Sequence, residues 1–296
     1  MKTASGWIRV AAAMGFLFAG AMEAGSASLT FQAKKNITNN FSPPFYEASG
    51  LGIAKNESKL WSVGDENNFT MYKMELNGTA VSDNVAAPGT SVTILNASFE
   101  GVTYAPPPPG ISDDHYIYLV DENSDSVVPV NYNTNEYLAP IPLSSMAGYY
   151  TVGCAGSTQK VGEIFDADQG DNIGLEGITW NSHLSKFFLI KEKSPGLMIQ
   201  VSADLSTIQA CKTLTHSNAD YSDISYDPTR GKYWIVSDEG NSVALYDWST
   251  GSAVQQWGLT YGGGEGVAFN PETSQLFIAT DNGNGQTSYL YIYKVQ

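Results

Sequence analysis

The chain has 296 residues, of which 15 are Lys or Arg and 30 are Asp or Glu, so its formal net charge is −15. A surface with this excess of negative charge repels nucleic acid and anionic membranes, and it attracts cations such as calcium, which prefers carboxylate oxygens. The length allows one large domain or two small ones. The composition therefore excludes a nucleic-acid-binding role and leaves cation binding open.

Residues 1–27 have the pattern of a secretory signal peptide. Lys2 and Arg9 flank the start of an apolar stretch over residues 10–22, and small residues follow up to Ala27. The apolar stretch is too short to cross a bilayer comfortably, although a membrane-anchored N-terminal helix is the alternative. We expect cleavage after Ala27, no transmembrane span in the mature chain, and a secreted or extracellular location, or a periplasmic or cell-surface one in a bacterium.

An exported chain can carry covalent modifications that a cytosolic chain does not. Cys154 and Cys211 are the two cysteines, and they predict one disulfide, with two free buried thiols as the alternative. If the source is a eukaryote, the N-x-S/T sequons of the first third of the chain predict glycosylation, and they begin at Asn36, Asn40, Asn56, Asn68, Asn77 and Asn96.

Five short segments of similar sequence recur along the chain. ASGLGI (48–53) comes first, and FEGVTY (99–104), LEGITW (175–180), YSDISY (221–226) and GEGVAF (264–269) follow. After each segment comes an apolar run that ends in acidic residues, and then a third and a weaker fourth run. These runs are rich in β-branched and aromatic residues and are bounded by Gly, Asn, Asp and Ser, which indicates strands joined by turns.

Five repeats of about four strands each predict an all-β fold, a five-bladed β-propeller formed by residues 28–296 as one domain. The blades begin near residues 47, 98, 175, 221 and 264. The fifth repeat has three clear strands, and we expect the run at 29–37 to supply the fourth and close the ring. An insertion at about 145–174 interrupts the repeat. We interpret it as a long loop over one face, with a degenerate sixth blade, and hence a six-bladed ring, as the alternative.

Acidic residues at equivalent positions of different blades are expected to meet at the central channel, because the first strand of each blade lines it. Glu100, Glu176 and Glu265 occupy the same position, and Glu47 and Asp223 lie close to it in the two looser copies. Crowded carboxylates repel one another unless they take up protons or a cation. Calcium binds about six to eight oxygens, so these five residues predict a calcium site, with local structural pairing as the alternative.

Acidic residues also end the second strand of each repeat, and these form a second layer of candidates around the predicted metal. They are Glu66, Glu122, Glu192, Glu239 and Asp281. The alternative is that such acids only organise the next turn. The acidic loop at 166–177 is a weaker calcium candidate, because it lacks the spacing of an EF-hand. No catalytic residue is assigned, since the chain has no GxSxG, HExxH or P-loop motif.

The order of these motifs resembles the SdiA-regulated (YjiK-like) family over residues 44–295. The matching stretches are EASGLGI with LWSVGDE, FEGVTY with YLVDE, LEGITW with FLIKEK, and YSDISYDPTRGKYWIVSDEG. The resemblance implies a five-bladed propeller that carries calcium near the channel, and a distant similarity to NHL-repeat propellers, some of which are metal-dependent hydrolases. It supports Glu100, Glu176 and Glu265 as channel residues, with Glu47 and Asp223 as companions.

Two functions are compatible with these features. The preferred one is a secreted calcium-binding propeller that acts as a binding or recognition module for a protein, a glycan or a small molecule, without catalysis. The alternative is a calcium-dependent hydrolase of a lactone or phosphoester, in which calcium in the channel polarises a substrate oxygen. The absence of a His from the blade motifs disfavours the hydrolase. We expect a monomer with no nucleic-acid partner.

Overall fold

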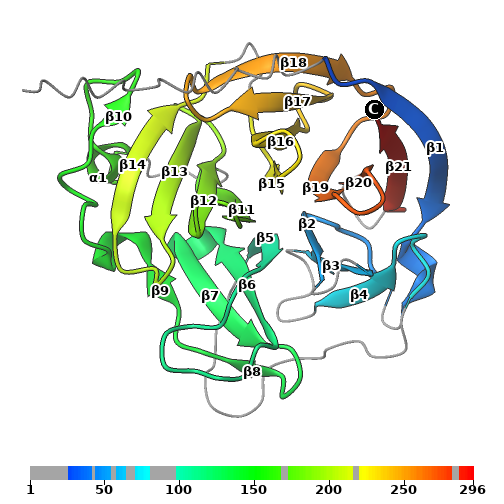
Figure 1. Cartoon of the computed structure of the whole chain (residues 1–296), viewed down its shortest axis with the longest axis horizontal. Coiled ribbons are helices and arrows are strands. Elements are labelled where there is room, and N and C mark those ends of the chain that lie inside the picture. The colour runs from blue at the N-terminus through cyan, green and yellow to red at the C-terminus, as the bar shows by residue number, and fades with distance from the viewer. Residues whose placement is uncertain are drawn as a thin grey trace, which may run out of the picture.

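The computed structural model is a five-bladed β-propeller, in which small antiparallel sheets surround a central axis (Figure 1). It describes residues 26–41, 44–54, 58–64, 71–80, 98–167, 173–215, 220–281 and 287–296. Within these residues the predicted all-β, five-bladed ring is confirmed, and the six-bladed alternative is wrong. The predicted signal peptide lies almost wholly outside the described residues.

Successive blades follow one another along the chain, and the innermost strand of each comes first, except that blades 3 and 5 each gain one outer strand from an earlier part of the chain. Blade 1 contains β2 (Gly50–Ile53), β3 (Lys59–Val63) and β4 (Tyr72–Glu75). Blade 2 contains β5 (Phe99–Tyr104), β6 (Tyr116–Asp121), β7 (Ser126–Asn131), β8 (Glu136–Tyr137) and β9 (Ile141–Pro142). Blade 3 contains β11 (Leu175–Asn181), β12 (Lys186–Lys191), β13 (Leu197–Ser202), β14 (Ile208–Thr213) and β10 (Cys154–Ala155). Blade 4 contains β15 (Asp223–Asp227), β16 (Lys232–Ser237), β17 (Ser242–Asp247) and β18 (Ser252–Gly258).

Blade 5 joins the two ends of the described chain. Its strands are β19 (Gly264–Asn270), β20 (Gln275–Thr280), β21 (Tyr289–Val295) and, from the N-terminal side, β1 (Leu29–Asn36). β1 pairs antiparallel with β21, from Leu29 opposite Val295 to Asn36 opposite Tyr289, and the two strands lie side by side in Figure 1. The expected closure of the ring by an N-terminal strand is therefore confirmed.

The core lies between the blades, because each sheet is covered on both faces. In β12, Phe187 and Leu189 pack toward blade 2, whereas the alternate residues Phe188 and Ile190 pack toward blade 4. Successive side chains of a strand point to opposite faces, so a sheet buried on both sides needs a continuous apolar run. This is why the second strands read as unbroken apolar segments.

The described residues include four helical segments, which are short and lie outside the sheets. They are η1 (Thr38–Asn40), η3 (Glu122–Ser124), η4 (Leu143–Ser145) and α1 (Val161–Phe165). None of the helices in the described residues has the length and apolar character that a membrane crossing requires.

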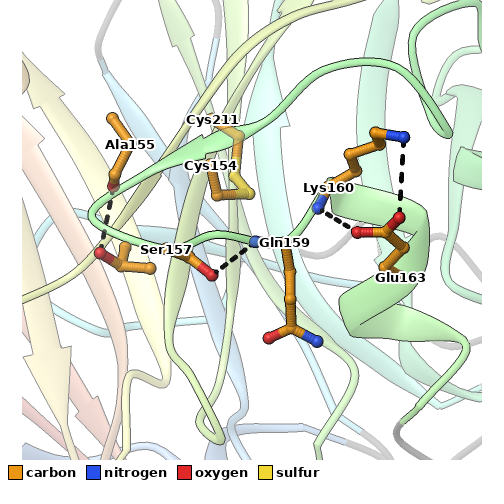
Figure 2. The surroundings of a disulfide bond; sticks show 8 residues. Cys154, Ala155, Ser157, Gln159, Lys160, Glu163 and Cys211 are labelled. Carbon is orange, nitrogen blue, oxygen red and sulfur yellow. Dashed lines mark hydrogen bonds and ion pairs between the residues drawn. A yellow bond between two sulfur atoms is a disulfide. The ribbon is translucent and has the colours of Figure 1, made fainter.

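The segment that interrupts the repeat adds to the outer edge of blade 3. β10 pairs parallel with β14, and the Cys154–Cys211 disulfide joins these two strands (Figure 2). The predicted disulfide is thus confirmed. In Figure 1, β10 and α1 lie at the periphery of the ring, and not over one face, where we expected the loop. The reason is that β14 offers an unpaired edge to β10, and the disulfide holds it there.

First strands approach one another so closely at the axis that a side chain is excluded from equivalent positions of neighbouring blades. A Cβ atom on Gly101 would lie 2.8 Å from both the carbonyl oxygen of Glu176 and Cα of Gly177. A Cβ atom on Gly50 would lie 2.3 Å from the carbonyl oxygen of Glu100. We call this narrowest part of the channel the throat; its residues are Gly50, Gly101, Gly177, Asp223 and Gly266.

Removal of the disulfide should destabilise the fold. The two cysteines are 57 residues apart, and a crosslink over such a loop typically contributes about 2–4 kcal/mol. The Cys154→Ala/Cys211→Ala variant should therefore lose a free energy of unfolding of this size in urea titrations. Reductant should lower the midpoint of the natural protein and leave that of the variant unchanged. An unchanged midpoint of the natural protein in reductant would contradict the prediction.

Gly101→Ala should destabilise the ring, because the new methyl group meets the backbone of blade 3. Overpacking typically costs about 1–3 kcal/mol, and rigid backbone neighbours favour the upper end. Gly258→Ala in β18 is the matched control, since its Cβ would meet nothing within 4 Å. Thermal unfolding should show a lowered midpoint for Gly101→Ala alone. Equal midpoints for the two variants would show that the throat tolerates a side chain at this position.

Candidate functional site

An acidic cavity of about 240 Å³ lies at the end of the channel where the first strands begin. Of its described lining residues, nine are acidic, one is Lys193, and two are Ser49 and Ser222. The acidic residues are Glu100, Glu122, Glu176, Glu192, Asp220, Asp238, Glu239, Glu265 and Asp281. The cavity therefore holds a large excess of negative charge.

Glu100, Glu176 and Glu265 meet in this cavity, as the repeat pattern predicted. Each directly precedes a throat residue, in β5, β11 and β19 respectively. The strand pairing skips all three: in β11, for example, Leu175 lies opposite Lys191 and Gly177 lies opposite Ile190. Each glutamate is thus the extra residue of a β-bulge, a feature that redirects a side chain away from the regular sheet faces.

The second-layer candidates that are described also line the cavity. Glu122, Glu192, Glu239 and Asp281 do so from the segments that follow β6, β12, β16 and β20. Glu66 lies outside the described residues. The structure therefore gathers acids from four blades in two tiers, one at the start of the first strand and one after the second strand.

Glu47 and Asp223 lie elsewhere. Glu47 is buried but is not among the cavity residues, and Ser49 lines the cavity from blade 1 instead. Asp223 is fully buried in the throat, where Oδ2 accepts hydrogen bonds from the backbone N–H groups of Leu51 (3.1 Å) and Val267 (2.8 Å). Its Oδ1 accepts from the N–H of Ile224 at 2.8 Å. This geometry makes Asp223 a link between blades 1, 4 and 5.

Hydrogen bonding separates the acids that build the fold from those that are available to a ligand. Asp220 accepts from the Ser237 hydroxyl at 2.5 Å and from the N–H groups of Asp238 and Glu239, so it organises the turn after β16. Glu176, in contrast, accepts no hydrogen bond from the described residues, and neither does Oε2 of Glu192. Local structural pairing therefore does not explain Glu176.

Lys193 is a basic counter-charge inside the cavity. Its Nζ lies 2.8 Å from Oε1 of Glu192 and 3.0 Å from Oε1 of Glu239, so it bridges blades 3 and 4. The sequence predicts Glu192 and Glu239 as second-layer residues but gives no role to Lys193, although it directly follows Glu192 in FLIKEK. One ammonium group cannot balance nine carboxylates.

The crowding changes proton affinities in the cavity. Glu176 is partly accessible to water but surrounded by protein on nearly all sides; burial raises its pKa well above the ordinary value, and the neighbouring carboxylates raise it further. Burial likewise raises the pKa of Glu265, and Asp238 adds to the effect. Burial raises the pKa of Glu192 to about 7, although Lys193 opposes the shift. The uncompensated negative charge of the cavity favours uptake of protons or of a cation.

The donor set fits a hard divalent cation, since it consists of carboxylate oxygens with two hydroxyl groups. Among the described residues, however, the group whose candidate ligand atoms all lie within 4.8 Å of one another is Asp113, Asp114 and His115, on the loop before β6. The cavity carboxylates stand farther apart. Calcium accepts water among its ligands, so it does not require direct coordination by every carboxylate of a site.

The metal-free protein should become less stable as the pH rises from about 4.5 to 7, the interval between the ordinary and the raised pKa of Glu192. In this interval the folded state binds more protons than the unfolded chain, so the free energy of unfolding falls with increasing pH. Thermal unfolding in EDTA should show a lower midpoint at pH 7.5 than at pH 5. A midpoint that rises across this interval would contradict the prediction.

Solved structures confirm the propeller architecture. The PQQ-bound aldose sugar dehydrogenase of Streptomyces coelicolor has a TM-score of 0.52 at 13% identity, with 92% of this chain and 99% of that chain covered. The glutaminyl cyclase of Myxococcus xanthus has a TM-score of 0.55 at 11% identity, with 90% and 97% covered. Identities this low establish a shared fold alone.

Sequence comparison identifies the family. None of the curated proteins matches the chain. The profile of the SdiA-regulated family matches residues 30–263, which include the first strands of blades 1 to 4 and end just before the first strand of blade 5. The match covers the bulged glutamates of blades 2 and 3 and the Asp223 link. The chain therefore belongs to the SdiA-regulated family of β-propellers.

Proposed function

We propose that this chain is an exported propeller that binds calcium at the acidic mouth of its channel and acts as a recognition module. The observation that carries the proposal is the cavity lining, whose described residues include nine acids and one lysine. Such an assembly of carboxylates costs stability unless a cation neutralises it. The disulfide supports export, because disulfides persist in oxidising compartments.

Glu100, Glu176 and Glu265 are the residues that would hold the ion, with Glu192 as a further candidate. All are hard oxygen donors, and they come from three different blades. A bound divalent ion would supply positive charge at the point where the blades meet, and would thereby fix the mouth of the channel. The surrounding loops would then present a rigid surface to a partner.

A calcium-dependent hydrolase is the second candidate, and Glu192 favours it. A general base works best with a pKa near the working pH, and burial raises the pKa of Glu192 to about 7. Its Oε2 has no hydrogen-bond partner in the described part of the chain. If the protein hydrolyses small lactones or phosphoesters in the presence of calcium, and Glu192→Gln abolishes this activity, the enzyme is favoured. If neither class of substrate is hydrolysed, the recognition module is favoured.

Calcium should raise the thermal midpoint of the protein, and EDTA should reverse the effect. At a calcium concentration about 100 times the dissociation constant, the stabilisation is about 2.7 kcal/mol. Glu176→Gln should weaken calcium binding about tenfold or more in calorimetric titrations. The substitution removes a charged carboxylate that accepts no hydrogen bond from the described residues and is therefore available to the ion.

Glu136→Gln is the matched control, since Glu136 is exposed on β8 at the outer edge of blade 2. It should bind calcium with unchanged affinity. Identical midpoints in calcium and in EDTA would remove calcium from the proposal. Full affinity in Glu176→Gln would place the ion elsewhere, with the acidic loop at 166–177 as the first alternative.

A further inference from the structure

A second cavity, of about 310 Å³, lies at the opposite mouth of the channel. In the first strands, the residues before the throat in sequence line the acidic cavity. The residues after the throat in sequence line the second cavity. Four of the five throat positions are glycines whose surroundings leave no space for a side chain. The fifth is Asp223, which is fully buried. The two cavities are therefore separate, and the second one does not depend on the proposed calcium site.

Hydroxyl groups of three neighbouring first strands form the wall near the throat. The Oγ1 of Thr103 accepts a hydrogen bond from Trp180 N at 3.2 Å, and Oγ1 of Thr179 accepts from Tyr226 N at 2.9 Å. The Oγ of Ser225 accepts from Phe269 N at 2.9 Å. A hydroxyl group also donates one hydrogen. Those of Thr179 and Ser225 reach no acceptor among the described residues, so two donors remain for a ligand in the cavity.

Aromatic and proline side chains form the outer wall, and they are held in place. Trp180 packs against Phe187 in a T-shaped arrangement with ring centroids 4.9 Å apart. The Tyr226 hydroxyl lies 2.9 Å from Nδ1 of His183. The Tyr118 hydroxyl donates to the carbonyl oxygen of Pro106 at 2.6 Å and so fixes the proline that borders the cavity. Such a preformed cavity with a few polar groups is typical of a small-molecule site.

Charge restricts the class of ligand. Every described residue that lines this cavity is uncharged, in contrast with the opposite mouth. A charged ligand would lose its hydration here without gaining an ionic partner, which is costly. A purely hydrocarbon ligand would leave the donors of Thr179 and Ser225 unsatisfied, which is also costly. The ligand class that remains is neutral, with an apolar face and oxygen acceptors.

The geometry points to this second cavity as a binding site for an uncharged pyranose ring, either as a free sugar or as the end residue of a glycan. The C–H groups on one face of a pyranose carry slight positive charge and pack against the electron-rich face of an aromatic ring such as Trp180 or Tyr104. The ring and hydroxyl oxygens accept hydrogen bonds from Thr179 and Ser225. The sugar is thus held between an aromatic wall and a wall of hydroxyl donors.

The test is titration of the full chain with neutral methyl pyranosides of glucose, galactose, mannose and N-acetylglucosamine, and with neutral oligosaccharides that end in each. Calorimetry and tryptophan fluorescence give the affinity, and indole serves as the aromatic comparator. We expect one sugar to bind with a dissociation constant of about 1 mM or lower, with the same affinity in EDTA and in calcium. Binding of an oligosaccharide but not of its monosaccharide would identify a glycan as the source of the ring.

Trp180→Leu should weaken this binding at least tenfold. Trp248→Leu is the control, because Trp248 packs on Phe188 outside the cavity and should not affect the affinity. Thr179→Ser should retain binding, since it keeps both the hydroxyl donor and the bond to Tyr226 N. Binding of indole alone, absence of binding by every sugar, or full affinity in Trp180→Leu would overturn the inference.

Discussion

The carboxylate of Asp223 is the interaction on which the centre of this ring depends. Thr103, Thr179 and Ser225 each accept a hydrogen bond from the next blade, and so they hold the seams from blade 2 to blade 5. The equivalent residues of blades 5 and 1 are Ala268 and Gly52, which have no hydroxyl group. Asp223 compensates at the seam between blades 5 and 1, because its single carboxylate accepts from Val267 of blade 5 and from Leu51 of blade 1.

The throat also explains why the channel has two chemically different ends. Close approach of the first strands requires glycine at four throat positions, and a bulge before the throat directs Glu100, Glu176 and Glu265 to one side. On the other side the strands are regular, and their hydroxyl and aromatic side chains face an uncharged cavity. One constraint on backbone distance thus produces an acidic mouth and a neutral mouth that do not communicate.

Local repetition explains what could be predicted from the sequence. The recurring glycine and the acid before it are short-range signals, and they predict the number of blades and the meeting of Glu100, Glu176 and Glu265. The closing strand follows from the fourth strand that the last repeat lacks. The sequence pattern groups Asp223 with the metal ligands because it is acidic, but its partners Leu51 and Val267 are 172 and 44 residues away. The neutral mouth was missed for a similar reason, since its threonines and serine are unremarkable until the blades stand side by side.

The acids of this protein differ in how far the fold itself accounts for them. Asp220 and Asp223 have hydrogen-bond donors on both oxygens, so their burial is explained by the turns and seams that they hold. Glu176 has no such donor among the described residues, and burial, with the neighbouring carboxylates adding to it, raises its pKa. A residue that violates the rules of stable folding without local compensation is usually retained for function. By this reasoning the proposed function rests on Glu176 more than on the better-bonded Asp223.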